Sequence, residues 1–138
     1  GIERSTRFNG NYIVNFLAGK EFKVGSNKQN LISTNLKLML AGGNRYTPID
    51  LEKSREAATE KLVEEKRFSL QADDYFRSDI RISYRKNKPK ASYILSLDIQ
   101  NVTNRQNMFA QYYDRMKEDI KTYYQMGMVP VLNYRIEF

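Results

Sequence analysis

The sequence predicts an all-β fold, an antiparallel up-and-down meander of about five strands. Apolar and polar residues alternate with a period of two in several segments, as expected for strands with one apolar and one polar face. The connections between these segments are alternately short and long. Every second connection of an antiparallel meander lies at the same end. We therefore expect short turns at one end of the sheet and long excursions at the other.

The first two predicted strands cover residues 11–24 and 31–43, with a short turn at 25–30. The second shows the alternation well, since Leu36 and Leu38 flank Lys37. Both strands therefore present one mainly apolar face.

The other three predicted strands cover residues 74–87, 92–102 and 123–138. The strand 74–87 has the clearest pattern, because isoleucines alternate with arginine and aspartate along DYFRSDIRISYRKN. A short basic turn, KPK at 88–90, leads into the next strand. The last strand is predicted to run to the final residue of the chain.

Two long loops separate these strands, at residues 44–73 and 103–122. Within the first, residues 50–66 lose the period of two and space their apolar residues as a helix does. Asp50 is a suitable N-cap, and acidic residues fill the first turn after it. We therefore predict a partly helical long loop near 50–66 and treat residues 1–138 as a single segment.

Composition argues against an enzyme. The chain has no histidine and no cysteine, which removes the commonest general base, the commonest metal ligand and any thiol nucleophile. A hydrolase that relies on the carboxylates of Asp79 and Asp98 is disfavoured, because neighbouring arginines keep both groups ionised. We expect no catalytic residue, no metal and no cofactor.

The net charge of +7 does not by itself indicate a nucleic-acid partner. Basic residues are interleaved with acidic ones, and no run of five like charges occurs. Charge of this kind is typical of solvated strands and loops, and we expect no binding to nucleic acid.

The positions of aromatic residues favour a membrane β-barrel over a soluble β-protein. Alternation alone fits both, because a barrel turns its apolar face to lipid and its polar face to the lumen. In this sequence aromatic residues gather near the strand ends, while mid-strand apolar residues are mostly aliphatic, as in the lipid-facing band of a barrel. The polar residues would then form a ladder facing the lumen: Arg77, Asp79, Arg81, Asp98, Gln100, Arg135 and Glu137.

Four segments resemble the last strands of TonB-dependent outer-membrane receptors, in a consistent order over most of the chain. They are GGNRYTPIDLEKS (42–54), DYFRSDIRISYRKN (74–87), LSLDIQNVTNRQNMF (95–109) and YYQMGMVPVLNYRIEF (123–138). LDIQNVTNRQN and the final YRIEF are the most specific. The closest resemblance is to the large group whose relatives import glycans or other nutrients.

The resemblance implies that the chain is the C-terminal part of a barrel of about 22 strands. Such receptors carry an N-terminal plug and are energised by TonB, and some work with a surface lipoprotein. The implied location is the outer membrane of a Gram-negative bacterium, and the implied partners include outer-membrane lipid. Alternate residues at the end of the chain resemble the signal read by the barrel-assembly machinery: Leu132, Tyr134, Ile136 and Phe138.

The predicted function is therefore nutrient import, to which the chain contributes barrel wall and external loops without covalent chemistry. Four loop residues are candidates for ligand contact, since arginine and aromatic side chains suit polar or flat ligands: Arg45, Tyr46, Tyr112 and Tyr113. The alternative is a small soluble β-domain that binds an apolar ligand or a partner protein. That alternative requires the apolar faces to converge inward.

Overall fold

The structure is a computed structural model that describes residues 5–26 and 28–138. It is mostly β, with 57% strand and 8% helix. The chain forms two compact units. The sheet unit comprises Val14–Met39, Phe76–Arg105 and Met126–Phe138, and the loop unit comprises the described residues up to Ile13 with Leu40–Tyr75 and Gln106–Gln125.

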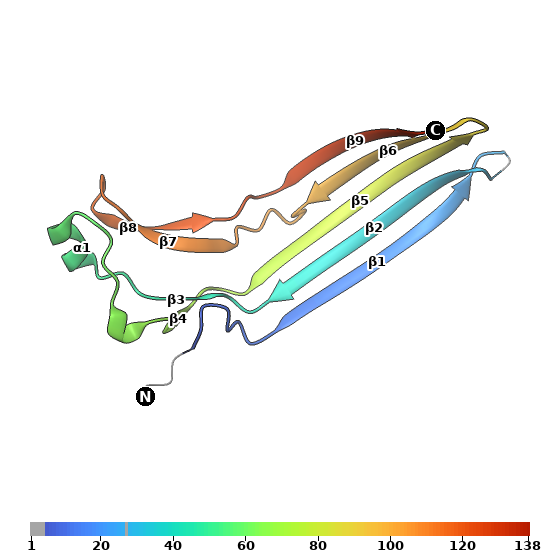
Figure 1. The fold of residues 1–138 in the computed structure, drawn as a ribbon. Coiled ribbons are helices and arrows are strands. Elements are labelled where there is room, and N and C mark those ends of the chain that lie inside the picture. The colour runs from blue at the N-terminus through green and yellow to red at the C-terminus, as the bar shows by residue number, and fades with distance from the viewer. Residues whose placement is uncertain (1–4, 27) are drawn as a thin grey trace. The chain divides into compact units, whose positions relative to one another are not determined.

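The sheet unit is an antiparallel sheet of five strands, as predicted. The strands are β1 (Ile13–Val24), β2 (Asn30–Ala41), β5 (Tyr75–Lys88), β6 (Ala91–Gln100) and β9 (Val129–Glu137), in the spatial order β1-β2-β5-β6-β9 (Figure 1). The order follows the chain, so the sheet is a meander with β1 and β9 at its two edges. The short β1–β2 and β5–β6 turns lie at the same end of this sheet (Figure 1).

Pairing places the apolar residues of neighbouring strands in straight rows. Ile82 pairs with Leu97, and Leu97 pairs with Leu132. The next row in the same parity joins Tyr84, Leu95 and Tyr134. Since successive residues point to opposite faces, these rows lie on one face and the charged residues between them lie on the other.

The fifth strand begins later than predicted. Tyr123 and Tyr124 end β8 (Asp119–Tyr124), which pairs with β7 (Met108–Asp114). The predicted loop at 103–122 therefore contains most of a hairpin, closed by the Gln125 N–H, which donates to the Asn107 carbonyl at 2.8 Å. Because β8 already uses residues up to 124, the terminal strand starts at Val129.

Pro130 fits this edge strand. It pairs with Ile99 of β6 near the start of β9. Proline has no N–H to donate and is therefore confined to edge strands, strand starts or bulges. Pro130 is the second residue of β9, which lies at the edge of this five-stranded sheet.

The loop unit contains short elements between β2 and β5: β3 (Arg45–Tyr46), α1 (Leu51–Ala57), the 3-10 helix η1 (Glu64–Lys66) and β4 (Leu70–Gln71). The partly helical loop predicted near 50–66 is confirmed by the two helices. Neither of them has the length or apolar composition to cross a bilayer, and no other helix occurs among the described residues.

Helix α1 is capped at both ends. The Asp50 carboxylate accepts a hydrogen bond from the Lys53 N–H at 3.1 Å, which satisfies one of the free donors of the first turn. Ala58 ends the helix in the left-handed conformation. Ser54 is fully buried, and its Oγ donates to the Asp50 carbonyl at 2.6 Å and accepts from the Lys61 N–H at 2.9 Å.

The Asp50 cap makes the stability of α1 depend on pH. The Lys53 N–H bond and the Lys53 ammonium lower the pKa of Asp50 below its ordinary value of 3.8. A lowered pKa means stabilisation that is complete above the ordinary value and is lost as the pH falls through the folded pKa. The protection of the α1 amides from hydrogen exchange, measured relative to the intrinsic exchange rate at each pH, should therefore decrease below about pH 4. Asp50→Ser keeps a cap but cannot titrate, so an unchanged acid response in this variant would contradict the assignment.

Two glycines allow close backbone contact in the loop unit. A Cβ on Gly42 would overlap the Gly10 carbonyl oxygen, and one on Gly43 would overlap the Ala72 carbonyl oxygen. Both glycines are buried. Only a residue without a side chain fits at these positions.

Candidate functional site

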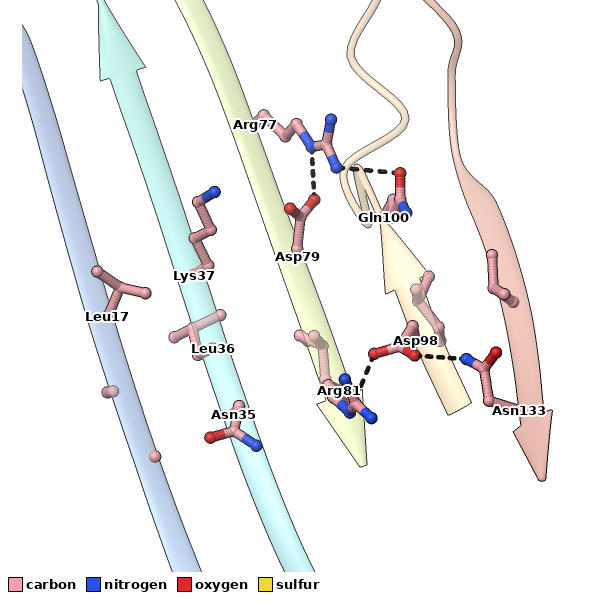
Figure 2. A pocket seen from close by; sticks show the side chains of 15 residues that line it. Leu17, Asn35, Leu36, Lys37, Arg77, Asp79, Arg81, Asp98, Gln100 and Asn133 are labelled. Carbon is pink, nitrogen blue, oxygen red and sulfur yellow. Dashed lines mark hydrogen bonds and ion pairs between the residues drawn. The ribbon is translucent and has the colours of Figure 1, made fainter. Parts of the chain in front are cut away.

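The polar face of the sheet carries the residues predicted to form a ladder, and it is hollowed in the middle. The hollow measures about 580 Å³ and is lined by residues of all five strands, among them Gly19 of β1, Lys37 of β2, Asp79 of β5, Asp98 of β6 and Asn133 of β9. Figure 2 shows the charged side chains of β5 and β6 reaching toward one another across it.

Arg77 bridges β5 and β6 at one end of the hollow. Its Nε is 2.7 Å from Asp79 Oδ1, and its Nη2 donates to Gln100 Oε1 at 3.1 Å (Figure 2). Asp79 also accepts the Asn101 N–H at 2.9 Å. The structure thus connects three members of the predicted ladder in one network.

Arg81 and Asp98 form the next bridge. They face each other in register, with Arg81 Nε 3.4 Å from Asp98 Oδ1. Asn133 of β9 donates to Asp98 Oδ2 at 2.9 Å (Figure 2). Arg81 Nη2 also donates to the Ser96 hydroxyl at 3.4 Å, and Ser96 is only 2% exposed.

Glu137 joins two arginines near the other end of the polar face. Its carboxylate lies 2.6 Å from Arg135 Nη2 and 3.4 Å from Arg85 Nη2. Between the two arginines in register lies Ile94, an apolar residue on the polar face that is 8% exposed. Long arginine stems can cover an apolar residue while their charged ends stay wet.

Asn101 is a central residue of this region that the sequence prediction did not single out. It is 4% exposed, has a φ of 51°, and its Nδ2 donates to the carbonyls of Arg105 and Met126 at 3.0 and 3.3 Å. Asn104, with a φ of 52°, accepts the Met128 N–H at 2.9 Å. The two asparagines therefore connect the end of β6 to the segment that leads into β9. Asparagine tolerates the left-handed conformation better than most residues, which was the available sequence signal.

The four loop candidates are not brought together. Arg45 and Tyr46 line a hollow of about 190 Å³ in the loop unit, and Tyr112 and Tyr113 do not. Tyr112 instead packs edge-on against Tyr123, with ring centroids 6.1 Å apart. Tyr113 is 8% exposed, so its ring is not presented to a ligand on the surface of the loop unit.

The opposite face of the sheet is apolar and exposed. On its central strands Ile82, Leu95 and Leu97 are exposed, and on β9 the exposed fractions of Leu132 and Tyr134 reach 70% and 63%. Ile136 shares this face, pairing with Tyr93, and Phe138 follows the end of β9 fully exposed. The four residues of the predicted assembly signal thus lie on and beyond the edge strand.

The charged groups of the polar face are mostly paired with one another. Asp79, Asp98 and Glu137 each face an arginine, so these carboxylates are engaged as ion-pair partners. No group of three or more histidine, cysteine, aspartate or glutamate side chains suited to a metal occurs in the described part of the chain. A row of paired charges on a concave face suits the lining of a water-filled space.

No protein-family model matches the chain, and no curated protein or solved structure is significantly similar to it.

Proposed function

We propose that the chain supplies five adjacent strands to the wall of a transmembrane β-barrel, that of a TonB-dependent outer-membrane transporter for nutrients. In this role it performs no covalent chemistry. The observation that carries the proposal is the distribution of polarity over the sheet. One face is aliphatic and exposed, while the other holds several ion pairs, two of which border a hollow.

A soluble sheet is expected to have the opposite exposure. Its apolar face packs on a core, and its charged face meets water. Here two buried residues of β6, Ile94 and Ser96, lie on the polar face, while Ile82, Leu95 and Leu97 of the apolar face are exposed. A contiguous apolar surface larger than a few hundred Å² marks a contact with protein or membrane. Lipid is the partner that fits a band of aliphatic side chains spanning several strands.

The open edges support the same proposal. β1 and β9 each have a neighbour on one side only. Five strands do not close a barrel, since the smallest single-chain examples have about eight. Unpaired edges promote aggregation, and closing the sheet into a barrel removes them. We infer that both edges pair with further strands in the working protein.

The import part of the proposal rests on the resemblance to TonB-dependent receptors. On this proposal the protein lies in the outer membrane of a Gram-negative bacterium, with the charged ladder facing the lumen. Assembly would use the barrel-assembly machinery, which reads Leu132, Tyr134, Ile136 and Phe138. Energy would come from TonB, and a surface lipoprotein is a further candidate partner.

Site-specific labelling tests which face meets lipid. The chain has no cysteine, so a single introduced cysteine carries the only label. Leu132→Cys and Asn133→Cys form a matched pair, being adjacent residues on opposite faces of β9. Each labelled protein is reconstituted into phosphatidylcholine vesicles that contain a lipid with a quencher on its acyl chain. We expect strong quenching at position 132 and weak quenching at 133.

Equal, weak quenching at both positions, together with a stable monomer in plain buffer, would favour the soluble β-domain. The gene tests the import part separately. The region upstream of this segment is expected to encode a plug domain and about seventeen further strands. An independent start with its own signal peptide directly before the segment would contradict import.

A further inference from the structure

The positive charge of the chain is concentrated at one end of the sheet. The chain has 23 basic and 16 acidic residues. Eight of the basic residues and only two of the acidic ones lie at 20–28, 84–93 and 134–138, which together are called the basic end. The basic end therefore holds a net charge of +6 out of the total of +7. This concentration of charge is not evident from the sequence, in which basic and acidic residues are interleaved. It appears in the structure because hairpin pairing brings separate turns to the same end of the sheet (Figure 1).

Lysines of the basic end border the apolar face directly. Lys86 pairs with Tyr93 and Tyr93 with Ile136, in the row next to Tyr84, Leu95 and Tyr134. Lys88 pairs with Ala91 one step further toward the turn. Along this face the residues change from aliphatic to tyrosine to lysine, as at the boundary of a bilayer, where aromatic rings lie at the headgroup level and lysines reach outward.

These lysines are available to bind anions. The side chains of Lys23, Lys28, Lys86, Lys88 and Lys90 are exposed, and within the described residues none of them forms an ion pair. Two ammonium groups lie over aromatic rings instead. Lys88 Nζ is 5.2 Å from the centroid of the half-buried Tyr93, and Lys20 Nζ is 5.2 Å from the centroid of the exposed Phe22. By contrast, Arg85 and Arg135 are already held by Glu137.

We propose that the basic end binds the phosphate-bearing headgroups of anionic phospholipids in the leaflet on the short-turn side. The inference rests on the proposed membrane role and adds the lipid class that this end selects. A bilayer fits better than a nucleic acid, because the lysines continue an apolar face, and only a bilayer offers phosphate beside hydrocarbon. Lys86, Lys88 and Lys90 lie around a single turn and form the core of the surface.

Vesicle flotation tests the proposal with the full chain. Phosphatidylcholine vesicles measure insertion of the apolar face, and vesicles mixed with phosphatidylglycerol measure the added effect of anionic lipid. Each lysine near an anionic surface strengthens binding roughly fivefold. The triple variant Lys86→Gln, Lys88→Gln, Lys90→Gln should therefore bind the mixed vesicles on the order of a hundredfold more weakly, with little change on phosphatidylcholine. The preference for mixed vesicles should also decline with added salt.

The matched control is Lys61→Gln, Lys66→Gln, Lys117→Gln, which removes the same charge from exposed positions of the loop unit. It should keep most of the preference. Equal loss in both variants would overturn the inference, because net charge alone would then explain binding. Equal binding of the wild type to both vesicle types would overturn it and leave the membrane role intact. Failure to bind either vesicle type would overturn both.

Two competitors separate the lipid surface from other sources of phosphate. Inorganic phosphate should displace the chain no better than sodium chloride at equal ionic strength, and stronger displacement would indicate a site for free anions. Duplex DNA should compete weakly. Tighter binding to DNA than to mixed vesicles, lost in the variant at positions 86, 88 and 90, would overturn the proposal in favour of a nucleic-acid surface.

Discussion

Replacing Leu97 by arginine is expected to cost about 2–4 kcal/mol of the transfer free energy into a bilayer. Leu97 is on β6, in the middle of the row formed with Ile82 and Leu132. If this row faces hydrocarbon, an arginine there must carry its charge into lipid or distort the bilayer around it. The measurement is the partition of the chain between buffer and phosphatidylcholine vesicles.

The control for this change is Asn133→Arg, on the opposite face of the neighbouring strand. An arginine there would lie beside Asp98, to which Asn133 now donates, so partition should change little. In plain buffer the Leu97→Arg variant should be more soluble than the unchanged chain, because Leu97 is 38% exposed and the arginine interrupts the apolar face. Equal partition of the two arginine variants would contradict the assignment of lipid to the apolar face.

Replacing Asn101 by alanine is expected to destabilise the sheet unit by about 2–4 kcal/mol. The change removes the side-chain donor to the carbonyls of Arg105 and Met126 in a buried place. It also puts alanine at a φ of 51°, which only glycine, asparagine and aspartate adopt easily. The measurement is urea unfolding in detergent, with hydrogen exchange at β6 and β9 to locate the loss.

Asn101→Gly separates the two contributions to this loss. Glycine tolerates the left-handed conformation, so this variant should recover about 1 kcal/mol relative to alanine and no more. The exposed neighbour Gln106 provides the control, and Gln106→Ala should change stability by less than about 0.5 kcal/mol. A similar small effect at position 101 would show that the asparagine does not connect the two strands.

The sheet was predictable because its signal is local. Alternation around Ile80, Ile82 and Arg81 determines which residues share a face, and pairing of neighbouring strands then brings Arg81 opposite Asp98. The start of helix α1 was likewise predictable, because Asp50 belongs to a short-range capping pattern. In each case the interacting residues are near in sequence or related by simple hairpin geometry.

The remaining features depend on contacts that the local sequence does not encode. Tyr123 and Tyr124 continue an apolar pattern toward β9, and only their pairing with β7 assigns them to a hairpin. Asn101 donates a hydrogen bond to the carbonyl of Met126, which lies 25 residues away in the sequence. The basic end was missed for a related reason. The basic turn at 88–90 is visible in the sequence, but Lys23 and Lys28 come to the same end of the sheet only through strand pairing.

The strict register of β6 between β5 and β9 limits how the gene can change length. Insertion of a single codon within β6 would turn every later side chain of the strand to the opposite face. Asp98 would then move into the row now held by Ile99. Two codons inserted together would leave each later side chain of β6 on its present face and would shift only the turn that follows the strand. Related genes should therefore differ within these strands by even numbers of residues, whereas the tip between β7 and β8 should accept insertions of either parity.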